Sequence, residues 1–415
     1  MNAGAQLTGR MKERLVVIGG GQAAVQAIQS LRQGGFAGSI ALVGEEAHVP
    51  YQRPPLSKKY LAGAFERERL HLRPESFYAA REVDLHLGAR AEELDVATQR
   101  VRLSDGRVLA YDRLLLATGS RPRRLAVSGA DLAGIHYVRT IDDVDRIRAE
   151  LKPGARIVIV GAGYIGLEIA SVVAELGFDV TVLEAAERVL SRVMCAESAQ
   201  FFADYHAAHG VRIRCATQIS EFHGRDSATE VVSSGGQRFP CDVVIVGIGI
   251  VPNVELAARA GLPCDNGIRV DACARTRDPR IVAAGDCTNQ PHPFLGRNVR
   301  LESVNNAIEQ AKAAALSLLG QEQPFADVPW FWSDQYDLKL QIAGVAIDYD
   351  RVVQRGDMRT RSFAMYYLRQ KQLIAIDAVN SPRDFMQGKK LLASRIEVPV
   401  EQLADVEADL TRLLA

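Results

Sequence analysis

Two stretches of the chain share one pattern of apolar and polar positions. In each, a short apolar run rich in β-branched residues ends at a glycine cluster, and an alanine-rich segment with helical spacing follows. The runs are residues 14–18 and 156–160, and the clusters begin at Gly19 and Gly161. Short apolar runs that alternate with helical segments are typical of parallel strands and their crossover helices. The pattern therefore predicts two doubly wound α/β domains.

Both glycine clusters match the spacing of the dinucleotide-binding fingerprint, in which a strand ends at a turn that opens a helix. They read Gly19-Gly20-Gly21-Gln22-Ala23-Ala24 and Gly161-Ala162-Gly163-Tyr164-Ile165-Gly166. Glycine lets the backbone approach a pyrophosphate closely, and the helix offers unpaired N–H groups and its positive dipole end. One such motif is weak, but two in the same context predict that the protein binds two dinucleotides.

Each fingerprint needs an acidic partner about 20 to 25 residues further on, where a carboxylate accepts hydrogen bonds from ribose hydroxyls. In the second half, the apolar run 179–183 ends at Glu184. Its negative charge would repel a 2′-phosphate, which favours NADH over NADPH. Arg188 and Arg192 follow closely and leave this preference open.

The acid of the first half comes slightly late. The apolar run 40–43 is followed by Gly44 and only then by Glu45. We expect Glu45 to bind the ribose of the first dinucleotide, with Glu46 as the alternative.

Two further segments predict how the nucleotide-binding halves are nested. Residues 111–119 and 241–250 each read as a buried strand that ends in a turn, as expected for two crossings between domains. The expected regions are a disordered leader, residues 1–10; a first nucleotide-binding domain, residues 11–119 and 248–324; a second one inserted into it, residues 120–247; and a C-terminal domain, residues 325–415.

The last third of the chain changes its pattern. Residues 281–286 read as a strand ending at Asp286, and residues 301–319 as a helix whose start could present N–H groups to a ligand. Beyond them, antiparallel strands are expected at 338–345, 351–354, 363–368 and 373–379, a hairpin turn at 369–372, and helices at 384–394 and 401–414. The predicted fold is α/β, with two Rossmann-like domains, one inserted in the other, and a C-terminal α+β domain.

Charge and hydropathy exclude several classes of function. Lys plus Arg and Asp plus Glu are equal at 50 each, so no global field would hold nucleic acid or an anionic membrane. No apolar run approaches the roughly 18 residues that cross a bilayer, and residues 1–10 lack the apolar core of a signal peptide. We expect a cytoplasmic protein.

The six cysteines argue against thiol chemistry. They are Cys195, Cys215, Cys241, Cys264, Cys273 and Cys287, and they include no close pair. A flavin enzyme that reduces disulfides needs a dithiol near its ring, and a peroxidatic relative needs one reactive thiol there. We expect all six to be buried or incidental thiols.

These motifs, in this order, resemble one family from about Met11 to the end of the chain: the FAD-dependent ferredoxin reductases of bacterial oxygenase systems, of the putidaredoxin reductase and biphenyl dioxygenase reductase type, within the glutathione-reductase-like flavoproteins. The most specific matching segments are Arg53-Pro54-Pro55-Leu56-Ser57-Lys58, Leu116-Ala117-Thr118-Gly119, Gly161 to Glu168, Gly247-Ile248-Gly249, Gly285-Asp286-Cys287 and Pro329-Trp330-Phe331-Trp332-Ser333-Asp334-Gln335-Tyr336.

The resemblance implies FAD at the first fingerprint and NADH at the second. The implied FAD contacts are Gly19, Gly21, Ala23, Glu45, Arg53, Lys58, Ala91, Arg139, Asp286 and Val304. The implied NAD contacts are Gly161, Gly163, Ile165, Gly166, Glu184 and Gly249.

Three residues have implied roles in the reaction. Lys58 would lie near flavin N5 and pair with Glu168, so that the pair positions the nicotinamide. Trp332 would lie at the mouth of the flavin site. The alternatives are a solvated loop lysine, a first-turn helix acid and a tryptophan that only packs between domains.

The implied reaction is hydride transfer from NADH to FAD, followed by single-electron transfer to a [2Fe-2S] ferredoxin that serves a haem monooxygenase or a Rieske dioxygenase. Such ferredoxins are usually acidic, so a basic patch is expected near Trp332, with Lys312, Lys339 and Lys389 as candidates. The alternatives are a rubredoxin reductase, an NADH oxidase or a redox-signalling flavoprotein of the apoptosis-inducing-factor type. The chain is expected to be a monomer or a weak homodimer.

Overall fold

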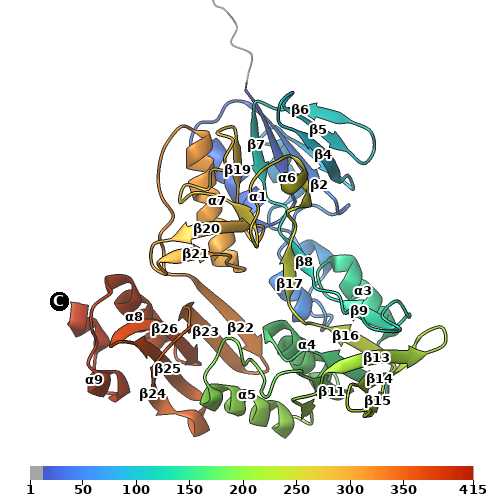
Figure 1. Ribbon diagram of the computed structural model, residues 1–415, viewed down its shortest axis with the longest axis vertical. Coiled ribbons are helices and arrows are strands. Elements are labelled where there is room, and N and C mark those ends of the chain that lie inside the picture. The colour runs from blue at the N-terminus through green and yellow to red at the C-terminus, as the bar shows by residue number, and fades with distance from the viewer. Residues whose placement is uncertain (1–12, 415) are drawn as a thin grey trace, which may run out of the picture. The chain divides into compact units, whose positions relative to one another are not determined.

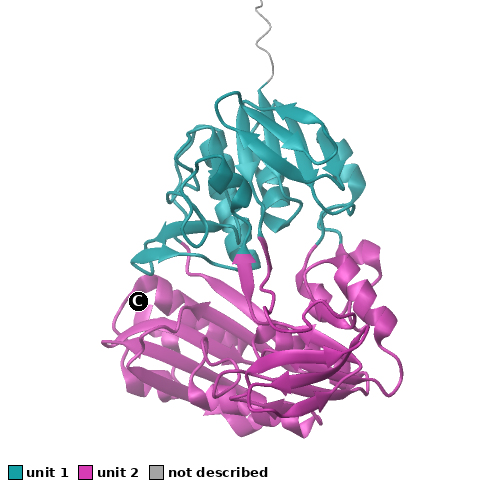
Figure 2. Cartoon of the chain, turned by 45° about the vertical axis from the view of Figure 1, so that its right-hand side comes forward, with its two compact units in different colours: residues 1–51, 71–119, 252–326 teal, residues 52–70, 120–251, 327–415 magenta. Residues whose placement is uncertain are grey.

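The computed structural model describes residues 13–414, so the predicted leader lies outside the described residues. The chain forms two compact units (Figure 2). Unit 1 consists of residues up to 51 with 71–119 and 252–326, and unit 2 consists of residues 52–70, 120–251 and 327–415. The division of unit 2 into separate nucleotide-binding and C-terminal domains stays a prediction.

Unit 1 is built around a parallel five-stranded sheet of order β19-β7-β1-β2-β3. Its strands are β1 (Arg14–Ile18), β2 (Ser39–Gly44), β3 (Val83–Leu87), β7 (Arg113–Leu116) and β19 (Ile281–Ala283). The helices of this unit are α1 (Gln22–Gln33), α2 (Glu75–Ala79), α6 (Glu255–Arg259) and α7 (Val304–Leu318). Two three-stranded sheets complete it, β4 (Ala91–Asp95), β5 (Arg100–Leu103) and β6 (Val108–Ala110), and β18 (Ile268–Arg269), β20 (Thr288–His292) and β21 (Arg297–Val299).

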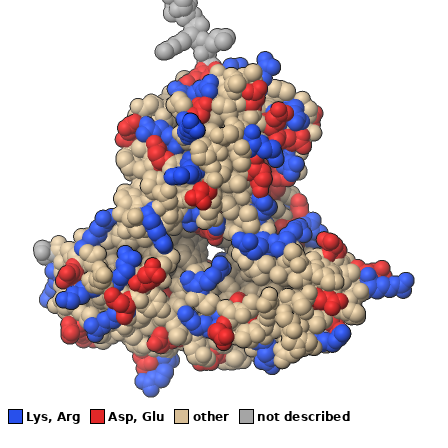
Figure 3. Space-filling view, viewed as in Figure 1, with Lys and Arg blue, Asp and Glu red and all other residues tan. Residues whose placement is uncertain are grey.

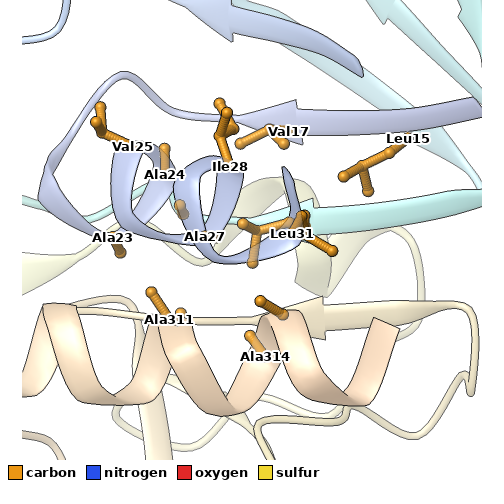
Figure 4. Packing of buried hydrophobic residues seen from close by; sticks show 14 of the residues in the cluster. Leu15, Val17, Ala23, Ala24, Val25, Ala27, Ile28, Leu31, Ala311 and Ala314 are labelled. Carbon is orange, nitrogen blue, oxygen red and sulfur yellow. The ribbon is translucent and has the colours of Figure 1, made fainter. Parts of the chain in front are cut away.

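Small side chains let helices α1 and α7 pack closely beside this sheet. Figure 4 shows alanines of α1 facing Ala311 and Ala314 of α7, while Val17 and Leu15 of β1 lie on the other side of α1. Ala27 and Ala311 are fully buried. Because alanine has no side chain beyond Cβ and the best helix propensity, the alanine-rich pattern favours both the helices and their close contact.

Unit 2 contains a second parallel five-stranded sheet, of order β12-β11-β10-β16-β9 (Figure 1). Its strands are β9 (Ile135–Tyr137), β10 (Arg156–Val160), β11 (Asp179–Leu183), β12 (Arg212–Arg214) and β16 (Val243–Val246). The accompanying helices are α3 (Ile141–Glu150), α4 (Tyr164–Glu175) and α5 (Ala196–Ala208). The further strands are β13 (Ile219–Gly224), β14 (Ala228–Ser233) and β15 (Arg238–Pro240) in one antiparallel sheet, and the pair β8 (Ser120–Pro122) and β17 (Ile250–Pro252).

The C-terminal part of unit 2 is an antiparallel sheet of order β22-β23-β26-β25-β24. Its strands are β22 (Trp330–Gln335), β23 (Leu338–Gly344), β24 (Arg351–Asp357), β25 (Ser362–Arg369) and β26 (Gln372–Val379). Helices α8 (Pro382–Ser394) and α9 (Val400–Ala404) follow. The predicted hairpin turn is confirmed: Gln370 and Lys371 both have positive φ, as a two-residue turn between twisted strands requires.

Two details of the sequence prediction change. Strand β22 was not anticipated, although its residues belong to the octet that carried the family resemblance most sharply. The helix expected over residues 301–319 begins only at Val304, because the hydroxyl of Ser303 caps it by accepting a hydrogen bond from the Asn306 amide.

The single helix predicted for residues 401–414 is wrong. The structure has α9, then a non-helical stretch, then a 3-10 helix at Leu410–Leu414. The cause is the buried guanidinium of Arg355, which pairs with Asp384 and donates to five backbone carbonyls between residues 402 and 408. Orientation toward Arg355 turns these carbonyls out of the direction that a continuous helix requires.

Candidate functional site

The first glycine turn lies at the carboxyl end of β1. Gly19 has a φ of +117°, and a Cβ there would lie 2.0 Å from the Ala117 carbonyl oxygen, so only glycine fits. Gly21 is the N-cap of α1 and provides no side-chain cap, and a Cβ on it would meet nothing within 4 Å. The first turn of α1 therefore faces open space with its N–H groups uncapped by a side chain, as an anion-binding helix start requires.

Asp286 follows β19 at the same edge of the sheet, because all five strands are parallel. The preceding Gly285 packs between two helix starts: a Cβ on it would lie 3.3 Å from that of Ala23 in α1 and 4.0 Å from that of Ala307 in α7. Its amide donates to Gln310 Oε1 over 2.8 Å, which fixes the turn. Val304 is the first residue of α7. Ala23, Asp286 and Val304 are thus brought to one region of unit 1.

Glu45 and Ala91 also follow strand ends at this edge. Glu45 comes directly after β2 and is exposed, and Ala91 follows the end of β3 by a few residues. The alternative acid, Glu46, accepts a hydrogen bond from the Tyr51 hydroxyl. Its carboxylate is thereby partly engaged within the protein, which favours Glu45 as the ribose ligand.

The second glycine turn leaves no room for a side chain at two of its glycines, Gly161 and Gly166. A Cβ on Gly161, whose φ is +105°, would lie 2.4 Å from the Gly247 carbonyl oxygen, and a Cβ on Gly166 would lie 2.0 Å from the Gly161 carbonyl oxygen. Gly163 caps α4 without a side chain, and a Cβ there would meet nothing within 4 Å. Ile165, in the first turn of α4, is 46 % exposed although the rest of this helix is largely buried.

Glu184 lies directly after β11 and closes onto the glycine turn. Its Oε2 accepts from the Ala162 amide over 2.6 Å, and its Oε1 accepts from the Ala186 amide over 2.9 Å. Of the two nearby arginines, Arg188 donates to the backbone carbonyls of its own loop. Arg192 is exposed, and its guanidinium would lie 3.9 Å from a Cβ on Gly249. The expected NAD contacts of unit 2 therefore lie at one edge of its parallel sheet.

Lys58 and Glu168 form a buried ion pair, as the resemblance implied. The distance from Lys58 Nζ to Glu168 Oε2 is 2.7 Å, and the two side chains are only 16 % and 5 % exposed. Two serines donate to the same carboxylate, Ser57 Oγ to Oε2 over 2.6 Å and Ser333 Oγ to Oε1 over 2.7 Å. Burial of a carboxylate is costly unless charge and hydrogen bonds compensate, and here three donors do so.

The segment that carries Lys58 is anchored within unit 2. Lys58 follows a 3-10 helix at Pro54–Ser57, whose two prolines fix its start. Arg53 donates to the Arg139 carbonyl oxygen over 2.5 Å. Further along, Tyr60 and Arg67 both donate to the carboxylate of Asp145 in α3. The structure thus places Arg53, Lys58 and Arg139, three of the predicted cofactor contacts, in one unit.

Ser57 and Ser333 are the residues that sequence reasoning missed. Both lie inside segments that had been singled out for neighbouring residues, Lys58 and Trp332. Serine is too common to be noticed alone. The available signal was the period-two pattern of the octet, in which Ser333 has the opposite facing from Trp332.

Trp332 is half-buried on the opposite face of β22 from Ser333. Its ring lies 5.8 Å from that of Trp330, and Lys389 of α8 lies 5.2 Å from the Trp330 ring centroid. Of the other candidate lysines, Lys339 is exposed in unit 2, and Lys312 of unit 1 pairs with Glu309 over 2.8 Å. Trp332 and Lys389 therefore both lie next to the Trp330 ring.

In the part of the chain that the structure describes, the cysteine thiols form no disulfide, and burial raises the pKa of several of them. All six cysteines are free. Burial raises the pKa of the Cys215 thiol, which is nearest to Glu184, and raises that of Cys241 to about 12. Protonated thiols are poor nucleophiles. No group of three metal-ligating side chains occurs among residues 13–414, and none of the helices described there is long and apolar enough to cross a membrane.

The two glycine turns fit dinucleotide phosphates, because both open onto space beside an uncapped helix start. Two such turns on two parallel sheets, with a buried ammonium–carboxylate pair, define an oxidoreductase of the two-dinucleotide class.

Comparison with known proteins supports the assignment to this class of oxidoreductase. Residues 13–311 match the pyridine nucleotide-disulphide oxidoreductase family, and residues 330–414 match a family described as reductase C-terminal. Rhodocoxin reductase of Rhodococcus erythropolis is 43 % identical over 402 residues, which cover 97 % of this chain and 94 % of that protein. Putidaredoxin reductase of Pseudomonas putida is 40 % identical over 409 residues, 97 % of each protein.

A crystal structure of a covalent putidaredoxin reductase–putidaredoxin complex is similar with a TM-score of 0.94 at 40 % identity, covering 98 % of this chain and 99 % of that chain. The chain belongs to the pyridine nucleotide-disulphide oxidoreductase family, and the resemblance inferred from the sequence motifs is confirmed. Membership of this family implies FAD and NAD(P)H as cofactors.

Proposed function

We propose that this protein is an NADH-dependent ferredoxin reductase that serves an oxygenase. The observation that carries the proposal is the pair of open, glycine-lined helix starts, one on each parallel sheet, which gives the chain sites for two dinucleotides. We assign FAD to the site of unit 1 and NADH to that of unit 2. When bound, NADH supplies a hydride, and FAD accepts two electrons together and releases them singly.

The residues of unit 1 would hold FAD in four ways. The amides at the start of α1 face the pyrophosphate, and the carboxylate of Glu45 accepts from the adenosine ribose. The Asp286 carboxylate accepts from the ribityl hydroxyls, and the start of α7 at Val304 stabilises negative charge at the pyrimidine edge. Ala91 of unit 1 is assigned a further contact that the family resemblance implies. Arg53, Lys58 and Arg139, for which the resemblance implies contacts as well, belong to unit 2.

In unit 2, the start of α4 would bind the NADH pyrophosphate and Glu184 the adenosine ribose. Glu184 also receives two amide hydrogen bonds, so its carboxylate is held where it would repel a 2′-phosphate. This supports NADH over NADPH as the preferred donor. Exposed Arg192 is the residue through which NADPH could still be accepted.

The Lys58–Glu168 pair is proposed to position the reacting rings. The carboxylate of Glu168 fixes the ammonium of Lys58 in one orientation, and both are shielded from water. A fixed donor in a dry site contributes more to orientation than a solvated one does. The pair itself neither gains nor loses a proton in this proposal.

The acceptor is proposed to be a small acidic [2Fe-2S] ferredoxin. Putidaredoxin reductase, a relative of 40 % identity, has been captured in a covalent complex with putidaredoxin. We assign docking to the neighbourhood of Trp332 and Lys389 in unit 2, with Lys339 of the same unit as a further contact. Basic and acidic side chains are interspersed on the face shown in Figure 3, so we expect steering by local charges and not by one large basic area.

Stopped-flow mixing tests the proposal. The purified protein should be yellow, should bleach when NADH is added, and should then reduce an added [2Fe-2S] ferredoxin faster than it reduces oxygen. Prompt oxygen consumption without ferredoxin would indicate an NADH oxidase. Transfer only to rubredoxin would indicate a rubredoxin reductase, and very slow bleaching would indicate a redox-signalling flavoprotein.

A further inference from the structure

One face of β22 is polar although it is buried. Ser333 and Gln335 alternate along the strand and are 0 % and 1 % exposed. Their partners on β23, Leu340 and Leu338, are apolar and fully buried. Burying a polar group costs free energy unless the group finds a hydrogen-bond partner. If these positions had only a structural role, apolar residues would stabilise the fold more.

The polar face continues a hydrogen-bond chain that begins at Glu168. Ser333 Oγ lies 2.7 Å from Glu168 Oε1, and Gln335 Nε2 lies 3.2 Å from Ser333 Oγ. Gln335 Oε1 in turn lies 2.9 Å from Nε2 of His206 in α5, and the His206 Nδ1 lies 3.4 Å from the Tyr336 hydroxyl. Glu168 and His206 are 4 % and 0 % exposed, so the chain is dry from Glu168 to His206.

All the donors in this chain point toward Glu168. Ser333 has one hydroxyl hydrogen, which it donates to the carboxylate, so its oxygen accepts from the Gln335 amide. The Gln335 carbonyl oxygen must then accept from His206 Nε2, which fixes the neutral imidazole with its proton on Nε2 and leaves Nδ1 as the acceptor for Tyr336. Hydrogen bonds that run in one direction polarise one another and strengthen the last one.

We propose that Ser333, Gln335 and His206 are positioning residues for the hydride-transfer site, acting together as a relay that holds the Glu168 carboxylate in one orientation and, through it, the ammonium of Lys58. The inference rests on the proposed function, because the relay acts on the Lys58–Glu168 pair that is proposed there to position the reacting rings. It also gives the C-terminal sheet a part in the reaction, because Ser333 and Gln335 belong to that sheet.

The state of His206 supports this assignment. Burial lowers the pKa of His206 to about 4, so the imidazole is neutral at physiological pH. A neutral imidazole adds no charge that would compete with Lys58 for the carboxylate. It supplies the Nε2–H donor that sets the direction of the whole chain.

Two variants interrupt the relay. Ser333→Ala removes the direct donor to Glu168, and Gln335→Glu keeps the shape of residue 335 but replaces the amide donor by an acceptor. The matched control is Ser171→Ala. Ser171 is a buried residue of α4, like Glu168, but its hydroxyl donates over 2.8 Å to the backbone carbonyl of Glu168 and not to the carboxylate. All three variants are compared as holoenzymes with the wild type.

The first measurement is the rate of flavin reduction by NADH. Loss of one hydrogen bond to a charged group is expected to slow reduction about tenfold or more in both relay variants. The NADH Michaelis constant should change less than twofold, and Ser171→Ala should leave both quantities near those of the wild type. Equal kinetics for Ser333→Ala and Ser171→Ala would overturn the proposal.

The second measurement does not depend on turnover. Infrared spectra of the resting protein, with glutamate carboxyl groups labelled by carbon-13, report the hydrogen bonding of the carboxylates. The band that is lost in Glu168→Gln is assigned to Glu168; it should shift in both relay variants and stay in place in Ser171→Ala. If that band does not move, the relay does not hold the carboxylate. If it moves but wild-type flavin is not reduced by NADH, the proposed function has failed while the relay stands.

Discussion

The two parallel sheets contain the same local arrangement, a central strand that ends at a glycine turn and continues into a helix. In unit 1, β1 pairs with β2 so that Ile18 is opposite Val43, and in unit 2, β10 pairs with β11 so that Val160 is opposite Leu183. The first glycine after each central strand donates to the end of its neighbour, over 2.8 Å from Gly19 and 2.7 Å from Gly161. The pairing register and this hydrogen bond are therefore the same at both sites.

The difference lies in the side chains that close each turn. Glu184, whose carboxylate bonds to the glycine turn, directly follows Leu183. The equivalent residue in unit 1, directly after Val43, is Gly44 at the end of β2, and the acid is the next residue, exposed Glu45. A Cβ on Gly44 would lie 3.3 Å from the Leu87 side chain, so packing against β3 restricts this position. Two sheets with the same strand register can thus place their acidic residues differently. The glycine turn that would bind phosphate is shared by both sites, whereas the acid that would bind ribose differs between them.

The largest expected effect concerns the last position of each fingerprint. Gly166→Ala would place a Cβ 2.0 Å from the Gly161 carbonyl oxygen, so the turn or α4 must move. The equivalent position of the first turn already holds a methyl group, that of fully buried Ala24. We expect Gly166→Ala to lower the free energy of unfolding by about 3 kcal/mol or more, and to raise the NADH Michaelis constant strongly.

The reciprocal change is the control for that experiment. Ala24→Gly should cost only about 1 kcal/mol and should leave NADH kinetics unchanged. Denaturant unfolding and steady-state kinetics measure both effects. Similar losses in the two variants would contradict the close contact at Gly166.

Unit 2 also contains two buried groups whose pKa is shifted by burial, and their effects on stability have opposite signs. Burial lowers the pKa of His206 to about 4, so below pH 6.5 the unfolded state binds a proton that the folded state does not, and stability falls as the pH drops from 6.5 to 4. Burial raises the pKa of Asp377 to about 7, so the folded state keeps a proton that the unfolded state loses, and stability falls as the pH rises from 4 to 7.

Single variants should separate the two contributions. Relative to wild type, His206→Gln should gain up to about 3 kcal/mol as the pH falls from 6.5 to 4, and Asp377→Asn should gain stability as the pH rises from 4 to 7. Trp330 and Trp332 are the only tryptophans and both belong to unit 2, so their fluorescence follows its unfolding. A pH-independent difference for either variant would contradict the assigned titration.

The two ribose acids should have separable effects. Glu184→Ala should raise the NADH Michaelis constant about tenfold, since hydrogen bonds to a charged group are lost, while FAD retention stays unchanged. Glu45→Ala should instead weaken FAD retention during gel filtration and leave the NADH constant unchanged. Effects on the opposite cofactor would reverse the assignment of the two sites.

The smallest expected effect is that of thiol alkylation. Cys287 lies in unit 1 next to Asp286 and is fully buried, and Cys215 lies in unit 2 near Glu184 and is half-buried. Burial raises the pKa of both thiols, which keeps them protonated at pH 7. Iodoacetamide at pH 7 should leave NADH-driven ferredoxin reduction within about twofold of the untreated rate, given how little thiolate is present. Rapid loss of activity would reveal a catalytic thiol.

Local signals in the sequence were sufficient for the nucleotide-binding turns. The strands predicted at 14–18, 156–160 and 179–183 have those bounds in the structure, because a short β-branched run that stops at a glycine or a charged residue is decided within a few residues. The helix predicted at 401–414 failed for the opposite reason. Its break depends on Arg355, which lies about fifty residues earlier and is placed by the sheet.

The sequence by itself determined the class of fold, the two glycine turns and the acid of the second one. Only the tertiary structure decided how Glu168 is held: its carboxylate meets Ser57 across 111 residues and Ser333 across 165 residues of chain. Contacts of this kind depend on how separate elements pack and leave no local pattern, whereas turns and strands are set by the conformational preferences of neighbouring residues.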